Sequence, residues 1–288
     1  MKIFTAAACV LWLFGMCANS AFAQQDTMSL SSNPPKPKGS TGLAVKPAKI
    51  DFTLGRGEAA YQVVYITNEF NRTMQFKANV LDWMRDSTGA HQYAEPGTYS
   101  RSCARWVSFN KDVIEIEPGK TGELLVRMIV PDSAEAISEM KWCLVMLESV
   151  TENKKLTPSD SSRAVVNMTM RLGIHILQTP QSFLTDKNIE MVSFTADKID
   201  SRQFKILCRN TGKTQLQCLS FLEVTSLQTG EKIKLDSKKF PIFPDQKRYV
   251  SFTLPATLAK GKYTVTAVVD AGDDDVPLLA SEAVVDLK

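Results

Sequence analysis

The chain has 288 residues, of which 44% are hydrophobic and 23% are charged, and its formal net charge at pH 7 is only +3. This length and composition are those of a folded protein with room for more than one domain. Because the basic residues are scattered among acidic ones, the chain has no electrostatic footprint for nucleic acid.

The first 41 residues predict an export signal followed by a tether. Lys2 precedes a long apolar run, and ANSAFA follows that run, so we expect a signal peptide over residues 1–23, cleaved after Ala23. We reject a lipoprotein anchor at Cys17, because Met16 fills the preceding position, which requires a small residue. Residues 24–41 are proline-rich and lack apolar periodicity, which predicts a flexible tether. No later stretch approaches the roughly 18 apolar residues of a membrane span.

From residue 42 onward, the pattern predicts short strands separated by turns. Strands are expected over residues 59–68 and 73–83, and residues 112–131 predict a hairpin that turns at Pro118 and Gly119. A further strand over residues 141–150 leads into the polar loop 151–163. Helix is limited to one possible turn within residues 132–140. Regularly spaced short strands of this kind are typical of a β-sandwich.

Residues 164–180, AVVNMTMRLGIHILQTP, place apolar side chains at every second position. This period predicts a long strand with one apolar face and one mixed face. The apolar face either packs on a sandwich core or stays partly open at a sheet edge for another protein. We expect the residues from Val166 to Ile174 to lie at an edge, partly exposed, where loop 151–163 or a self-capping dimer could cover them.

After Pro180 the pattern begins again. Residues 202–224 mirror residues 61–83, with an apolar strand, an asparagine (Asn210 for Asn68), a polar turn and a second strand. Residues 243–255 likewise mirror the segment around Pro118 and Gly119. This repeat at domain scale predicts a duplication. We therefore expect an all-β fold of two Ig-like β-sandwich domains in tandem, over residues 42–182 and 183–288.

Four cysteines remain after the predicted cleavage: Cys103, Cys143, Cys208 and Cys218. An even number in an oxidising compartment suggests disulfides, and four cysteines allow three connectivities. The spacing favours one bridge per domain, Cys103–Cys143 and Cys208–Cys218. Since no C-x-x-C or Cys/His spacing is present, we expect no metal site.

The side chains that would carry catalysis are missing. The two histidines, His91 and His175, have no Ser or Cys beside them in a nucleophile motif, and His91 is expected in a solvated loop. The acidic run 270–277 lacks the oxygen spacing of a calcium loop and is interpreted as a solvated turn. Trp83 and Trp106 lie at strand ends, where we expect them to plug a sandwich core. The sequence predicts neither an enzyme nor a cofactor.

Several segments of the first domain match one known family. They are LAVKPAKIDF (43–52), VVYITN (63–68), the segment around Pro118 and Gly119, SEMKWCLVMLESV (138–150), where Glu139 matches a family acid, and the alternating stretch 164–180. In these the domain resembles the PapD-like periplasmic chaperones of pilus assembly, whereas the second domain resembles them only in general pattern. The resemblance implies a periplasmic chaperone that binds exported subunits, pilin-like or other envelope proteins, by β-strand addition along its seventh strand. It implies this role for Val166, Met168, Met170, Leu172 and Ile174.

The family's cleft also holds two basic residues that bind a subunit's C-terminal carboxylate. Lys49 matches the first, and the second falls on His175, where the family normally has lysine. Arg171, on the same mixed face, could substitute for it. A neutral imidazole binds carboxylates less well than an ammonium, although burial beside an anion raises its pKa. Thr179 is a second departure, because the family usually carries there an arginine of an interdomain ion pair.

The rival interpretation is an Ig-like structural or adaptor protein of the cell envelope, which would use the same fold without releasing clients. The predicted disulfides and the missing arginine before Pro180 favour it.

Overall fold

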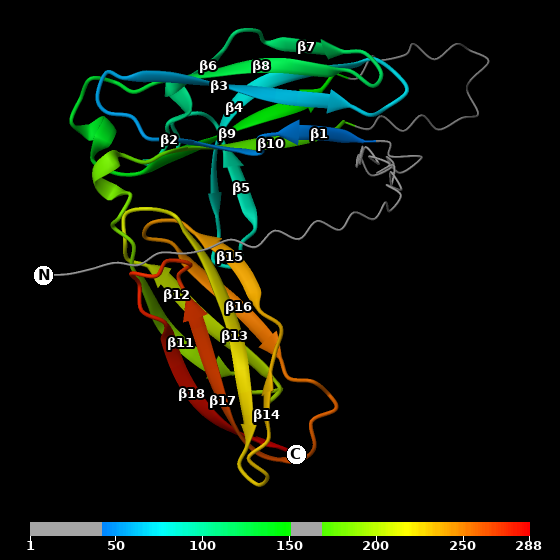
Figure 1. Cartoon of the computed structure of the whole chain (residues 1–288), viewed down its shortest axis with the longest axis vertical. Coiled ribbons are helices and arrows are strands. Elements are labelled where there is room, and N and C mark those ends of the chain that lie inside the picture. Colours follow the sequence, from blue (N-terminus) through cyan, green and yellow to red (C-terminus); the bar gives the residue numbers. More distant parts are fainter. Residues whose placement is uncertain (1–41, 151–168) are drawn as a thin grey trace, which may run out of the picture. The chain divides into compact units, whose positions relative to one another are not determined.

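The computed structural model describes residues 42–150 and 169–288, which form an all-β protein, as predicted (Figure 1). The strands before residue 180 are β1 (Leu43–Lys46), β2 (Lys49–Phe52), β3 (Ala59–Asn68), β4 (Met74–Arg85), β5 (His91–Ala94), β6 (Val107–Phe109), β7 (Val113–Ile116), β8 (Thr121–Ile129), β9 (Lys141–Ser149) and β10 (Arg171–Gln178). Those after it are β11 (Ile189–Ala196), β12 (Gln203–Asn210), β13 (Leu216–Ser226), β14 (Lys232–Lys234), β15 (Lys238–Ile242), β16 (Lys247–Thr253), β17 (Gly261–Asp270) and β18 (Leu279–Leu287).

Helix within the described ranges is limited to the short 3₁₀ turns η1 (Ala104–Trp106), η2 (Glu135–Ile137) and η4 (Gln181–Phe183). Of these, η2 is the helical turn predicted within residues 132–140. In the same ranges, no helix is long and apolar enough to cross a membrane. The predicted signal peptide, tether and loop 151–163 lie outside the described residues, as do Val166 and Met168.

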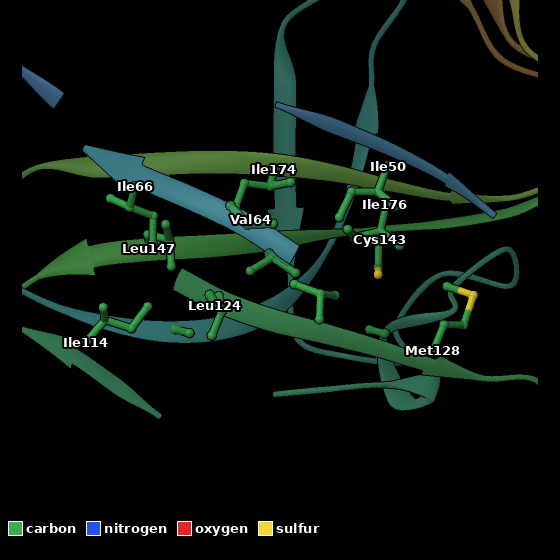
Figure 2. Packing of buried hydrophobic residues seen from close by; sticks show 14 of the residues in the cluster. Ile50, Val64, Ile66, Ile114, Leu124, Met128, Cys143, Leu147, Ile174 and Ile176 are labelled. Atoms are coloured by element: carbon green, nitrogen blue, oxygen red, sulfur yellow. The ribbon is translucent and has the colours of Figure 1, made fainter. Parts of the chain in front are cut away.

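Strands β1 to β10 form the first sandwich. Its four-stranded sheet has the order β1-β3-β8-β6, and its six-stranded sheet has the order β2-β10-β9-β4-β5, with β7 paired to β4. Alternate side chains of both sheets point inward, so that Val64, Leu124 and Ile174 pack in one apolar core (Figure 2). All three side chains are fully buried.

The chain changes sheet between its first two strands. β1 runs antiparallel to β3, opposite residues 65–68, whereas β2 runs parallel to β10, opposite residues 175–178. The crossing occurs at Pro47 and Ala48, between the two strands. As a result, β2 covers only the second half of β10, and residues 171–174 pair with β9 alone.

The predicted hairpin at Pro118 and Gly119 is wrong. The flanking strands lie in different sheets, because β7 pairs with β4 whereas β8 pairs with β3 and β6. Asn68 accounts for this arrangement: its side-chain amide donates to the Ile116 carbonyl at 2.9 Å, and its backbone carbonyl accepts from Gly119 at 2.8 Å. These bonds tie the turn to the end of β3, so the turn arches between the two sheets instead of closing a ladder.

Strands β11 to β18 form the second sandwich. One sheet has the order β11-β12-β16, and the other has the order β14-β13-β17-β18, with β15 paired to β13. Its own core includes Phe204, Val224 and Val265. The prediction of two β-sandwiches is confirmed, whereas the boundary set after residue 182 stays a prediction.

The internal repeat extends to individual hydrogen bonds. Asn68 and Asn210 are both fully buried, at the ends of β3 and β12. In each, Nδ2 donates at 2.8 Å to the carbonyl four residues later, and Oδ1 accepts from the N–H two residues later. Gly119 and Asp245 donate their N–H to the backbone carbonyls of these asparagines, and both have a positive φ, 70° and 64°. Each sandwich therefore contains its own arch of the same type. In the second arch Asp245 adopts the left-handed conformation that usually selects glycine.

The described cysteines are buried free thiols in this structure. Burial and a hydrogen bond with Cys103 raise the pKa of the Cys143 thiol well above its usual range. Burial also raises the pKa of Cys208 and of Cys218 to about 12. Each predicted pair therefore groups two thiols of the same core, but neither pair is bonded here, and both disulfides stay predictions.

Candidate strand-addition site

The candidate site is the first half of β10, which we call the half-edge (residues 170–174). On one side its backbone is paired with β9: the Met170 carbonyl accepts the Ser149 N–H at 2.8 Å. On the other side, His175 donates its N–H at 3.0 Å to the carbonyl just before β2. Because backbone groups of alternate residues point to opposite sides of a strand, the N–H and C=O of Arg171 and Gly173 point to the side that β2 does not reach. Among the described residues, no strand pairs with them there.

The apolar face of the half-edge changes from half-buried to buried along the strand. Met170 and Leu172 pack against the first core while partly exposed. Ile174, by contrast, is fully buried in that core (Figure 2). The expected exposure of Ile174 is therefore wrong, because it lies where β2 begins and the sandwich closes. The binding roles of Met170 and Leu172 stay predictions, and Val166 and Met168 lie outside the described residues.

The basic residues near the half-edge already have acidic neighbours. Lys49 lies opposite His175 in the parallel ladder between β2 and β10, and its Nζ is 2.9 Å from a carboxylate oxygen of Asp51. Arg171 Nε is 3.3 Å from a carboxylate oxygen of Glu148. Both the lysine and the arginine side chain are well exposed, so these ion pairs are weak.

His175 is neutral at pH 7. Burial, followed by the nearby His91, Arg85 and Lys49, lowers the pKa of the imidazole to about 4. The ring packs edge-on against Trp83, at 4.5 Å between centroids, and lies 5.7 Å from the ring of His91. His91 begins strand β5, and so the prediction of a loop histidine is wrong, although its side chain is exposed. Carboxylate anchoring by Lys49, Arg171 or His175 stays a prediction.

Trp83 is buried in a separate apolar cluster rather than in a sandwich core. Its indole N–H donates to the Cys143 carbonyl at 3.0 Å, and the Trp142 indole N–H donates to the Trp83 carbonyl at 2.9 Å. Both rings contact Phe243, which comes from the second sandwich. Trp106, by contrast, packs half-buried against the first core, as expected.

Arg101 joins acidic residues that sequence reasoning did not connect with it. Its guanidinium lies 3.2 Å from a carboxylate oxygen of Glu139 and 2.5 Å from one of Asp245 in the second sandwich. Thr179, where the family resemblance would place an arginine, is buried instead. No local pattern could reveal this ion pair, because Arg101 and Asp245 are 144 positions apart. Within the described ranges, no cluster of three or more His, Cys, Asp or Glu side chains could hold a metal ion.

Comparisons with known proteins give structural likenesses only. No known family and no curated protein matches the sequence. The chain is similar in structure to a chaperone in a chaperone–tip adhesin complex of CFA/I fimbriae, with a TM-score of 0.45 and 10% identity, over 84% of this chain and 98% of that one. It is also similar to the class 5 fimbriae chaperone CfaA (TM-score 0.44, 11% identity, 84% and 98% covered).

A further similar structure is the CsuC–CsuE chaperone–tip adhesion subunit complex of archaic Csu pili from Acinetobacter baumannii, with a TM-score of 0.44 and 13% identity over 84% of this chain and 97% of that one. The identities are low and the superpositions are loose. The chain is thus similar in fold to fimbrial chaperones over 84% of its length. What the half-edge does has to be argued from the residues of this chain.

Proposed function

We propose that this protein is a periplasmic chaperone-like protein that binds exported subunits by β-strand addition along β10. The observation that carries the proposal is the half-edge itself. The backbone groups of Arg171 and Gly173 lack a partner strand within the described residues, beside the half-buried side chains of Met170 and Leu172.

An open edge with alternating apolar side chains favours pairing with another chain. A subunit that lacks one strand of its own sandwich presents the complement, a row of unpaired backbone groups above an apolar groove. Each ladder hydrogen bond contributes about 0.5–1.5 kcal/mol net, and buried apolar surface contributes roughly 25 cal/mol per Å². Methionine at position 170 suits grooves of varied shape, because its unbranched thioether chain adapts. Binding of this kind needs neither a nucleotide nor a cofactor.

The residues Lys49, Arg171 and His175 supply the proposed contact with a client carboxylate. Lys49 and His175 are ladder neighbours, so one carboxylate could reach both side chains. An anion between them would raise the pKa of the imidazole and turn it into a second cationic donor. Lys49→Ala should therefore weaken client binding with little effect on stability, because the side chain is largely exposed.

Two substitutions at one position test strand addition directly. Arg171→Pro removes the N–H that points to the open side and leaves the bonds to β9 intact, since a proline is tolerated on an edge strand when its nitrogen faces outward. Arg171→Ala is the matched control, because it also removes the ion pair with Glu148 but keeps the N–H. Tagged variants are expressed in the periplasm, and the clients that co-purify with wild type are quantified by mass spectrometry.

We expect Arg171→Ala to retain its clients and Arg171→Pro to lose them, with both variants folded by circular dichroism. In the complex, the amides of residues 171 and 173 should also become protected from hydrogen exchange. If Arg171→Pro binds every client as wild type does, strand addition along β10 is wrong. If clients bind at the half-edge but are never released to pair with a second, purified subunit, the structural or adaptor role is favoured instead.

A further inference from the structure

Two arginines from distant parts of the chain meet at the turn between β4 and β5. Arg85 ends β4, and its guanidinium reaches the Gly89 carbonyl at 3.5 Å. Arg248, on β16, lies directly against Gly89, so that a Cβ built there would overlap its guanidinium. Gly89 also has a φ of 95°, which other residues rarely adopt. The same turn accepts a backbone hydrogen bond from β16, from the Tyr249 N–H to the Ser87 carbonyl at 2.7 Å.

The guanidinium groups of both arginines carry buried donors without an acceptor. In the described residues, four buried side-chain nitrogen or oxygen atoms lack a hydrogen-bond partner, and three of them are Arg85 Nε, Arg248 Nε and Arg248 Nη1. Arg202 shows the usual arrangement, since its two terminal nitrogens donate to backbone carbonyls at 2.7 and 3.1 Å. A buried charged donor without an acceptor is costly, so unsatisfied donors concentrated at one place point to a ligand that accepts from them.

The charges around these arginines favour an anion as that ligand. Neither Arg85 nor Arg248 forms an ion pair with any described residue. The acid beside them is Asp86, whose Oδ1 accepts the backbone N–H groups of residues 88, 89 and 90. Burial, followed by the charge of Arg248, lowers the pKa of Arg85, and burial followed by the charge of Arg85 lowers the pKa of His91. Lys49 also lies near this group, since its charge and that of Arg85 both lower the pKa of His175, which is itself neutral at pH 7.

We propose that Arg85 and Arg248 form a binding site for a small oxyanion, either a free sulfate or phosphate or the carboxylate of a polypeptide. Each guanidinium offers hydrogen-bond donors in a planar fork that matches the oxygens of such groups. The site lies apart from the half-edge of β10, and it does not depend on strand addition. Bound there, an anion would compensate two like charges that otherwise repel each other across the turn.

The binding of inorganic anions can be measured without any client. Thermal unfolding of the mature protein is followed in sodium sulfate and in sodium phosphate, with sodium chloride at the same ionic strength as reference. Sulfate and phosphate stabilise most proteins weakly and in proportion to concentration, so the informative signal is a saturable rise in Tm. We expect this rise in wild type and in Lys247→Gln, which removes an exposed charge next to Arg248. We expect it to be lost in Arg248→Gln and in Arg85→Gln.

Two peptides with the same sequence distinguish the source of the oxyanion. One has a free C-terminal carboxylate and the other a C-terminal amide, and both are titrated by calorimetry. Loss of one guanidinium should weaken binding roughly tenfold or more, as expected for a charge-assisted hydrogen bond. Affinity should also rise between pH 8 and pH 6, because an anion raises the pKa of the neighbouring His91.

Saturable binding of either inorganic ion, or of the free-acid peptide alone, supports the site and identifies its source when it is lost in Arg85→Gln and in Arg248→Gln. The anion site is overturned if sulfate and phosphate stabilise wild type, Lys247→Gln and Arg248→Gln equally and without saturation, and if the two peptides bind with equal affinity. If Arg248→Gln does not fold, the test relies on two other results: whether the wild-type rise in Tm is saturable, and whether Arg85→Gln loses it. Because no client enters these measurements, their failure would leave strand addition untouched, and loss of clients in Arg171→Pro would leave the anion site untouched.

Discussion

Replacing Ile174 by alanine should destabilise the first sandwich far more than the same change at Met170, although both side chains lie on one face of β10. Ile174 is fully buried within the core, and Met170 is only half-buried against it. Truncation of a buried isoleucine typically costs about 2–5 kcal/mol, and we expect about 3–4 kcal/mol here. For Met170, with part of its surface already in water, we expect about 1 kcal/mol.

Urea unfolding followed by tryptophan emission measures this difference in the relevant sandwich. After removal of the predicted signal peptide, which contains Trp12, the remaining tryptophans are Trp83, Trp106 and Trp142, all in the first sandwich. With a slope of about 2 kcal/mol per molar urea, the midpoint should fall by roughly 1.5–2 M for Ile174→Ala and by roughly 0.5 M for Met170→Ala.

The same assay separates an open half-edge from a packed core strand. Met170→Lys should fold with a midpoint close to that of Met170→Ala, because the ammonium can reach water past the half-buried position. Ile174→Lys should not fold, since it would bury an unpaired charge. If Met170→Ala lowers the midpoint as much as Ile174→Ala does, or if Met170→Lys unfolds, the half-edge is ordinary core and cannot offer side chains to a client.

Three further predictions concern other parts of the molecule. Because the folded state holds the pKa of His175 at about 4 against an ordinary 6.5, the unfolded chain takes up the proton first as the pH falls. The free energy of unfolding should therefore decrease progressively from about pH 6.5 to pH 4, and His175→Gln should flatten this part of the profile measured in urea. Arg101→Ala should leave the tryptophan-detected free energy of unfolding within about 1 kcal/mol of wild type, because Asp245 is well exposed and Glu139 keeps its ion pair with Lys141, yet increase proteolysis between the sandwiches; unchanged cleavage would show that the pair does not hold them together. Peptide mapping without reduction of protein from the periplasm should recover two bridges and no crossed pair: Cys103–Cys143 and Cys208–Cys218.

The strands and the repeat could be predicted from local residue patterns. Alternation with period two is a property of neighbouring residues, and it located β3 and the described part of the stretch from 164 to 180. The buried asparagines illustrate a stronger local signal. Asn68 and Asn210 each satisfy their own turn through bonds that reach only a few residues along the chain, so the same short motif appears in both sandwiches.

The location of the candidate site also followed from the sequence, but its limits did not. The alternating pattern assigned Met170, Leu172 and Ile174 to one face without showing which of them water can reach. That depends on β2, which lies more than 100 positions earlier and begins opposite His175. The unpredicted contacts share this property: Arg101 meets Asp245, and Arg85 meets Arg248, only after the strands that carry them have folded.

The sequence by itself thus determined the all-β class, the repeated sandwich and the face of β10 on which each side chain lies, because these follow from backbone alternation and turn chemistry within short segments. Tertiary structure alone decided the ladder partners of β7 and β8, the burial of Ile174 and the point on β10, before residue 175, beyond which β2 does not reach. The physical reason is that a strand's period selects its faces, whereas the cover on its edge is supplied by whichever distant strand the chain brings alongside.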